Sequence, residues 1–214
     1  MTVAGSPRRG GSIRGRSTPA AGVKIRGVLF DMDGTIVSVP YDWPRIKAEL
    51  GSGDVPILSY LDRLGEPGRS RKRAVLERHE TEATRRAVLK RGTKALLGLL
   101  AERGAKTALI TNNSRTNTEH LLERFRLTFD LVMTRESGLW KPSGAPLLAA
   151  MERLGLTRNV CCAVGDSHFD VTAAKAAGIP LIFVLNRDPG HFVEDGVEVV
   201  ASVEALRKRV EPML

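Results

Sequence analysis

The sequence predicts an α/β fold of three layers, in which helices cover both faces of a parallel sheet and a small all-helical cap is inserted after the first strand. Two observations support this fold class. Short apolar runs that end in polar residues recur along the chain, and segments with helical periodicity separate most of them. A long stretch after the first run, residues 38–91, contains helical patterns and no convincing strand. The length of 214 residues suits one domain with such an insertion.

The expected strands are five runs of residues, each apolar enough to be buried inside a parallel sheet. In chain order they are residues 25–30, 107–110, 131–133, 160–164 and 181–185. Each run ends in polar residues. In open parallel sheets ligands bind beyond the carboxyl ends of the strands, so we expect these polar residues to meet at one rim.

The helices expected between these strands have apolar residues at helical spacing. They cover residues 93–103, 116–126, 146–154 and 169–177. Gly104, Gly155 and Gly178 follow three of them, at positions where a helix C-terminus favours a left-handed residue. Alternation of strand and helix at this spacing requires right-handed crossover connections.

The inserted stretch is expected to form two or three helices, over about residues 43–50, 56–64 and 69–90. We therefore divide the chain into a tail (1–22), a core (23–37 and 92–214) and a helical cap (38–91). An insertion at this point of the topology should lie over the rim as a lid.

The basic charge of the chain is concentrated at its start. The sequence holds 33 Lys and Arg against 24 Asp and Glu, a net charge of +9. Six of the basic residues, and no acidic one, lie in residues 1–26, so the remainder carries only +3. The first 22 residues are rich in Gly, Ser, Arg and Pro and have no hydrophobic period, which is typical of a disordered tail.

This tail resembles an organelle transit peptide in its Arg and Ser content, but its Gly and Pro residues disfavour an amphipathic helix. We therefore expect a cytoplasmic protein with an N-terminal extension. The tail also lacks the aromatic residues that stack on bases, which argues against nucleic acid as a partner.

Cysteine content and hydropathy exclude two further classes. The two cysteines, Cys161 and Cys162, are adjacent and match neither a disulfide framework nor a zinc-binding spacing. We expect them to be buried apolar side chains. The longest uncharged apolar stretch, residues 176–186, is too short to cross a bilayer, so no membrane partner is expected.

Acidic residues gather after the first and fourth expected strands. Asp31 and Asp33 follow the first strand, and Asp166 and Asp170 follow the fourth. One Asp could simply cap a helix, but four carboxylates at one rim need a cation to balance them. Mg²⁺ prefers such oxygen ligands and keeps water or phosphate in its remaining positions.

Groups suited to an anion follow the second and third expected strands. Thr111 and Asn112 come at the end of the second strand and just before a helix, where hydroxyl, amide and backbone N–H groups favour a phosphate. Lys141 follows the third strand and would neutralise both phosphate and carboxylate charge at the same rim.

Together, and in this order, these residues resemble the four motifs of the haloacid dehalogenase-like (HAD) hydrolase superfamily. The matching residues are Asp31-Met32-Asp33-Gly34-Thr35, then Thr111, then Lys141, then Gly165-Asp166 through Asp170. The resemblance covers about residues 24–190 and implies a Rossmann-like core. An aspartate at the second carboxylate position of the first motif, Asp33, resembles the phosphoryl-transfer branch. The short helical cap resembles the phosphoglycolate phosphatase-like members.

The resemblance implies a role for each acidic residue. Asp31 would attack phosphorus and form an aspartyl-phosphate intermediate, and Asp33 would protonate the leaving alcohol and later accept a proton from water. Asp31, Asp166 and the backbone carbonyl of Asp33 would bind Mg²⁺. Asp170 would support Lys141 or a metal-bound water.

The remaining implied site residues are Thr111, Asn112 and Lys141, which would hold the phosphate oxygens. The implied function is a Mg²⁺-dependent phosphatase acting on a small phosphorylated metabolite, of the phosphoglycolate or sugar-phosphate type. A β-phosphoglucomutase-like phosphomutase, or a regulatory protein that binds phosphate or nucleic acid through the tail, are the alternatives. The sequence shows no heptad seam from which an oligomeric state could be predicted.

Three cap residues have two interpretations each. His79 lies near the apolar stripe of the long cap helix, so it would either face the site or pack within the cap. Arg45 and Lys47 would either reach an acidic substrate or lie on a solvated helix face.

Overall fold

The structure is a computed structural model that describes residues 24–186, 192 and 196–214. The expected basic tail, residues 1–22, lies outside the described residues. Of the expected fold, everything from the first strand to the end of the fifth falls inside them.

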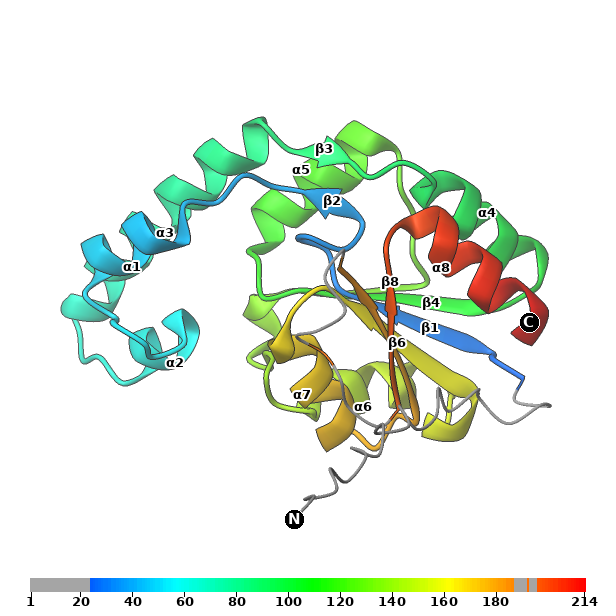
Figure 1. Ribbon diagram of the computed structural model, residues 1–214. Helices are drawn as coiled ribbons and strands as arrows, with labels where there is room; N and C mark the ends of the chain where they lie inside the picture. The colour runs from blue at the N-terminus through cyan, green and yellow to red at the C-terminus, as the bar shows by residue number, and fades with distance from the viewer. Residues whose placement is uncertain (1–23, 187–191, 193–195) are drawn as a thin grey trace, which may run out of the picture.

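The core is a parallel sheet of six strands (Figure 1). The strands are β1 (Gly27–Phe30), β4 (Lys106–Ile110), β5 (Leu131–Met133), β6 (Cys161–Gly165), β7 (Leu181–Leu185) and β8 (Val197–Val200). Their order in the sheet is β5-β4-β1-β6-β7-β8, and every neighbouring pair is parallel. The first strand therefore lies between β4 and β6, which places its carboxyl end at the middle of the rim.

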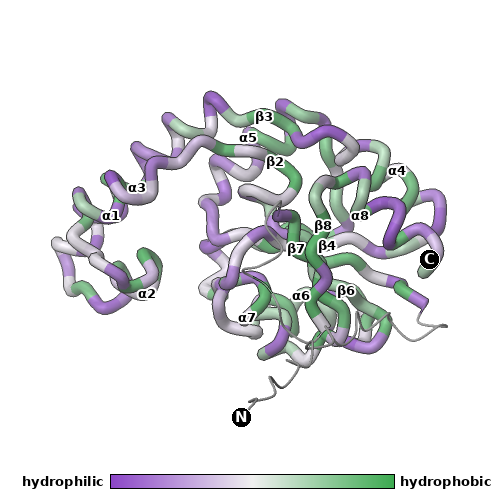
Figure 2. The backbone as a smooth tube through the Cα atoms, in the orientation of Figure 1, coloured by the Kyte–Doolittle hydropathy of each residue, from purple (hydrophilic) through white to green (hydrophobic). Residues whose placement is uncertain are grey.

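Helices cover both faces of this sheet and complete the three layers. One face is covered by α4 (Thr93–Glu102), α5 (Arg115–Phe125) and α8 (Val203–Val210), and the other by α6 (Ala145–Arg153) and α7 (His168–Ala176). Alternate residues of β1 supply the two hydrophobic cores: Phe30 packs with the first set of helices and Leu29 with the second. Figure 2 shows the most hydrophobic segments in the strands at the centre. The predicted α/β fold class is confirmed.

After the fifth expected strand, the described residues form two elements that the sequence did not predict. Strand β8 is half-exposed at the edge of the sheet, so it has no continuous apolar run to mark it. Helix α8 follows it and packs onto α4. Short 3₁₀ segments complete the core: η1 (Arg135–Ser137), η2 (Arg158–Val160) and η4 (Glu211–Met213). Among the helices of the described residues, none combines the length and apolar character that crossing a bilayer requires.

The stretch after β1 forms helices α1 (Trp43–Leu50), α2 (Ile57–Asp62) and α3 (Gly68–Arg85), which extend as an arm away from the sheet layers (Figure 1). They share a small hydrophobic cluster of their own, with Ile46, Leu50, Leu61 and Leu76 at its centre. Figure 2 shows that α3 is mostly hydrophilic, in keeping with one buried stripe on a solvated helix.

The long helix of the cap is shorter than the sequence predicted. A helix to residue 90 was expected, but α3 ends at Arg85 because the following residues form β3 (Val88–Leu89). This strand pairs antiparallel with β2 (Val37–Ser38), so the expectation of no strand in this stretch is wrong. The two chain segments that join cap and core are therefore hydrogen-bonded to each other.

A buried ion pair connects the cap to the core. The Arg135 guanidinium, at the start of η1, donates two hydrogen bonds to the Glu80 carboxylate of α3, at 3.0 and 2.5 Å. Both side chains are less than a tenth exposed. Burial raises the pKa of Glu80, and the charge of Arg135 opposes that shift. The C-terminal half of α3 is thus fastened to the rim side of the core.

We expect Arg135→Met to lower the free energy of unfolding by about 3–5 kcal/mol, because it leaves a buried carboxylate without its counter-charge. The double variant Glu80→Gln, Arg135→Met should recover most of that loss. Urea unfolding of the wild type and the variants measures both.

The deficit in the free energy of unfolding of Arg135→Met should also depend on pH. Without Arg135 the folded-state pKa of Glu80 rises further above its unfolded value, so protonation favours the folded state, and the deficit should narrow as the pH falls. Equal deficits for the single and double variants would contradict this account of the pair.

Candidate active site

The predicted residues follow four adjacent strands of the sheet, β5, β4, β1 and β6. In the register of the sheet Phe30 lies beside Leu109 of β4 and Val164 of β6. Asp31 therefore emerges between the residues that follow those two strands. All seven predicted site residues line one cavity of about 600 Å³ between the rim and the cap, namely Asp31, Asp33, Thr111, Asn112, Lys141, Asp166 and Asp170.

Lys141 lies between two of the carboxylates. Its Nζ is 2.6 Å from Asp31 Oδ1 and 2.6 Å from Asp170 Oδ1, and all three side chains are buried. Burial alone would lower the pKa of Lys141, but the two carboxylates outweigh it and raise the pKa above its usual value. The lysine is therefore charged at neutral pH and fixed in place by two ion pairs.

Asp170 uses its second carboxylate oxygen to organise the loop after β6. Oδ2 accepts hydrogen bonds from the backbone N–H of Asp166 at 3.2 Å, and from the N–H and hydroxyl of Ser167 at 3.1 and 2.6 Å. Burial opposes its ionisation, but Lys141 and these donors hold its pKa below the usual value. Gly165 permits this approach, because a Cβ there would lie 2.2 Å from Asp170 Cβ.

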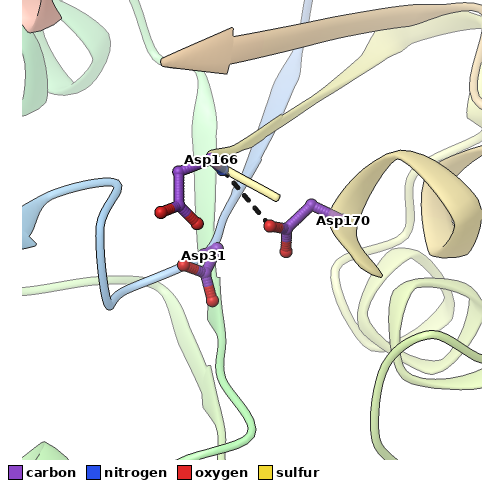
Figure 3. A group of neighbouring side chains, drawn as sticks. All are labelled: Asp31, Asp166 and Asp170. Atoms are coloured by element: carbon purple, nitrogen blue, oxygen red, sulfur yellow. Dashed lines mark hydrogen bonds between the residues drawn. The ribbon is translucent and has the colours of Figure 1, made fainter. Parts of the chain in front are cut away.

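Three carboxylates converge where the sequence predicted a metal. Figure 3 shows Asp31, Asp166 and Asp170 turned toward one another. One oxygen of each lies within 4.8 Å of the others. Burial, followed by the charge of Asp31, raises the pKa of Asp166 to about 7. The donor set consists of hard oxygens with excess negative charge, so the residues fit a divalent cation such as Mg²⁺.

Asp33 does not point its carboxylate into this cluster. Its Oδ2 accepts a hydrogen bond from Asn113 Nδ2 at 3.0 Å, and the Tyr41 hydroxyl lies 3.5 Å from its Oδ1. Asn113 Nδ2 also donates to the Tyr41 oxygen at 2.8 Å. Burial, and then the nearby charge of Asp31, raises the pKa of Asp33 to about 8. The raised pKa favours the protonated form of this carboxyl group.

Asn113 and Tyr41 were not expected from the sequence as site residues. Asn113 directly follows two predicted residues, which was the only signal available for it. Tyr41 lies in the segment that leads into the cap, and no pattern in the chain connects it to Asp33.

The two polar residues after β4 have different surroundings. Thr111 is buried, and its Oγ1 accepts the backbone N–H of Asn113 at 3.1 Å, which leaves the hydroxyl proton available for donation. The Asn112 side chain is bonded to the backbone of Lys141 in both directions, at 2.9 Å each. Asn112 thus holds the loop that carries Lys141, and its backbone N–H remains for an anion.

The Asp31 carboxylate is held at both oxygens. Oδ1 faces Lys141, and Oδ2 accepts the Thr35 hydroxyl at 3.1 Å. Burial raises the pKa of Asp31 to about 6, and Lys141 limits that rise. The pKa of Asp31 therefore lies below that of Asp33, because Lys141 contacts only the Asp31 carboxylate of the two.

Two other predicted features have outcomes in the structure. His79 Nε2 lies 2.6 Å from Glu49 Oε2 of α1, so this histidine packs within the cap and does not line the cavity. Cys161 and Cys162 are buried, as expected, and burial raises the pKa of Cys161 to about 11.

Comparisons with known proteins give a consistent result. The family described as haloacid dehalogenase-like hydrolase matches residues 25–178. A phosphoglycolate phosphatase of Rhodospirillum rubrum is 29% identical over 188 residues, which are 73% of this chain and 78% of that protein. An Arabidopsis thaliana protein described as haloacid dehalogenase-like hydrolase domain-containing is 29% identical over 175 residues, 75% of this chain and 71% of that protein.

Solved structures share the fold. The crystal structure of CbbY from Rhodobacter sphaeroides in complex with phosphate superposes with a TM-score of 0.65 and 22% identity. The match covers 85% of this chain and 96% of that chain.

Gly34 provides a test of the rim geometry. It has φ +81°, and a Cβ there would lie 1.8 Å from Asp166 Oδ2. We expect Gly34→Ala to displace either the loop or the carboxylate and to reduce hydrolysis of a phosphate ester on the order of a hundredfold.

Gly104→Ala is the matched control, because Gly104 also has positive φ, +68°, but a methyl group there would meet no other atom within 4 Å. It should lose about 1–2 kcal/mol of stability and keep its activity. Equal activity in the two variants would show that the close packing of Gly34 on Asp166 is not required.

Proposed function

The chain belongs to the haloacid dehalogenase-like hydrolase family, and from that premise we propose that it is a Mg²⁺-dependent phosphatase that hydrolyses a small phosphorylated metabolite through an aspartyl-phosphate on Asp31. The observation that carries the proposal is the contrast between the two carboxyl groups of the first motif. Asp31 faces the Lys141 ammonium, which favours its ionised form, whereas Asp33 faces the uncharged Asn113 amide, where its raised pKa favours the protonated form. A nucleophile and a general acid need these opposite states.

In the first half of the reaction an oxygen of Asp31 attacks phosphorus, and the bond from phosphorus to the ester oxygen breaks. The leaving oxygen takes the proton of Asp33, so the alcohol departs neutral. The hydrogen bond from Asn113 holds the Asp33 carboxyl group in one orientation.

In the second half the roles of Asp33 reverse. Its carboxylate takes a proton from water as the water oxygen attacks phosphorus, and Asp31 leaves as a carboxylate. Phosphate is released, and Asp33 is again protonated for the next cycle.

The phosphate is held by Thr111, Asn112 and Lys141. The buried Thr111 hydroxyl and the backbone N–H of Asn112 would donate to its oxygens, and the Lys141 ammonium would balance its charge. Lys141 is already aligned by Asp31 and Asp170, so little rearrangement is needed when substrate binds.

Asp31 and Asp166 are the carboxylates that would hold Mg²⁺, with the backbone carbonyl of Asp33 as a further ligand. When bound, the ion neutralises charge on the transferring phosphoryl group. Asp170 lies in the same cluster, but its Oδ2 accepts three hydrogen bonds from Asp166 and Ser167 and its Oδ1 faces Lys141, so its proposed role is to position Lys141 and the loop after β6.

We also propose the division into a core of residues 23–37 and 92–214 and a cap of residues 38–91 that closes over the rim. The separate hydrophobic cluster of the cap and the paired strands at its base support this division. A lid of this kind excludes water during the first half-reaction. The cytoplasmic location remains a prediction from the sequence.

Asp31→Asn should reduce turnover of p-nitrophenyl phosphate by about a thousandfold or more, because the amide cannot act as the nucleophile. Asp62→Asn, at an exposed aspartate of the cap, is the matched control and should leave turnover unchanged. Phosphate release at the wild-type rate from the Asp31 variant would refute the mechanism. Conversion of a hexose phosphate to its isomer without phosphate release would instead identify a phosphomutase.

Removal of divalent metal with a chelator should abolish hydrolysis, and Mg²⁺ should restore it. Asp166→Asn should raise the Mg²⁺ concentration for half-maximal activity by about tenfold or more. Mutation of a residue that only hydrogen-bonds to a metal ligand already weakens metal binding by about that factor, and Asp166 is proposed as a ligand itself. Binding of Mg²⁺ can be followed independently by calorimetry. Full activity in chelator would exclude the proposed metal.

A further inference from the structure

Aromatic side chains from both the cap and the core line the cavity. Tyr41 and Trp43 come from the start of the cap, Trp140 directly precedes Lys141, and Phe169 lies in the first turn of α7. Trp43 and Phe169 are 44% and 43% exposed. Large aromatic side chains left this exposed around a cavity are typical of a binding surface.

The aromatic pair on the cap side is fixed relative to the catalytic groups. The rings of Tyr41 and Trp43 lie 4.6 Å apart at 35°. The Tyr41 oxygen accepts a hydrogen bond from Asn113, the residue that also holds Asp33. The Trp43 ring is thereby tied through Tyr41 to the group that protonates the leaving oxygen.

The charge of the cap side does not suit a second anionic group on the substrate. Among the described residues, the charged side chains that the cap contributes to the cavity are Lys47, Asp54 and Glu80. Glu80 is already paired with Arg135, which does not line the cavity. The charge of Lys47 is therefore balanced by that of Asp54. Among the described residues, no arginine lines the cavity to bind a substrate carboxylate in bidentate fashion.

Resting on the function proposed above, we propose that the preferred substrate is a phosphomonoester whose alcohol carries an uncharged, flat aromatic or heteroaromatic ring. The ring stacks against Trp43, with Trp140 and Phe169 closing the cavity on the core side, while the phosphate lies at Asp31 and Lys141. A planar ring joined to the ester oxygen by a short linker fits this arrangement. The short, anionic alcohol of phosphoglycolate does not.

The test compares three alkyl phosphates whose leaving alcohols have similar reactivity: benzyl phosphate, cyclohexylmethyl phosphate and ethyl phosphate, together with phosphoglycolate. We expect kcat/KM for benzyl phosphate to exceed that for ethyl phosphate and for phosphoglycolate by about tenfold or more, since ring stacking contributes on that scale. The cyclohexyl compound should fall between them, because it is apolar but not flat.

Trp43→Ala should lower kcat/KM for benzyl phosphate by about tenfold more than it lowers kcat/KM for ethyl phosphate. Trp43→Phe, which keeps a ring, should retain most of the preference. Leu148→Ala serves as the control, because Leu148 is an exposed apolar residue outside the cavity. A higher kcat/KM for phosphoglycolate than for benzyl phosphate would overturn the proposal, as would an equal loss on all substrates in Trp43→Ala.

Binding of phosphonates separates this inference from the proposed function. Benzylphosphonate, which cannot be hydrolysed, should bind about tenfold tighter than ethylphosphonate by calorimetry. If no ester is hydrolysed but this difference is found, the aromatic site stands and the proposed function fails. If esters are hydrolysed but the two phosphonates bind equally, the function stands and the aromatic site is refuted.

Discussion

The ammonium group of Lys141, held between Asp31 and Asp170, is the interaction on which the site depends. Without it, the buried carboxylates at the end of β1 and β6 would repel one another, and each would tend to take up a proton. The lysine keeps Asp31 ionised and Asp170 in place, and Asp170 in turn orders the loop that presents Asp166. A network of this kind is specified by the fold, because its members come from three separate strand ends.

The same constraint explains the different state of Asp33. It lies two residues from Asp31 and shares its negative surroundings, yet its carboxylate turns away from Lys141 toward Asn113 and Tyr41. Neither of these neighbours is charged, so they offset only a small part of the effects of burial and of Asp31. Two aspartates of one loop thus have different partners, the Lys141 ammonium for Asp31 and two uncharged groups for Asp33, and the pKa of Asp33 is the higher of the two.

Much of this architecture was predictable from the chain, because apolar runs that end in polar residues mark both the strands and the rim. The contributions of Tyr41 and Asn113 were not, since they depend on how the cap entry packs against the end of β4. The sequence predicted the wrong end for α3, because a local helical pattern does not reveal the pairing between β2 and β3. The buried ion pair of Glu80 with Arg135 could not be predicted either. In the sequence Glu80 is one of many charged residues of α3, and only the folded chain shows that it is buried.

The central claim is that phosphoryl transfer passes through a covalent aspartyl-phosphate. Its most direct test is the stereochemical course of hydrolysis of a phosphorothioate ester that carries two oxygen isotopes at phosphorus, in water that carries the third. Two successive in-line displacements, first by Asp31 and then by water, predict retention of configuration in the released thiophosphate. Inversion would mean that water attacks the substrate directly and would contradict the account.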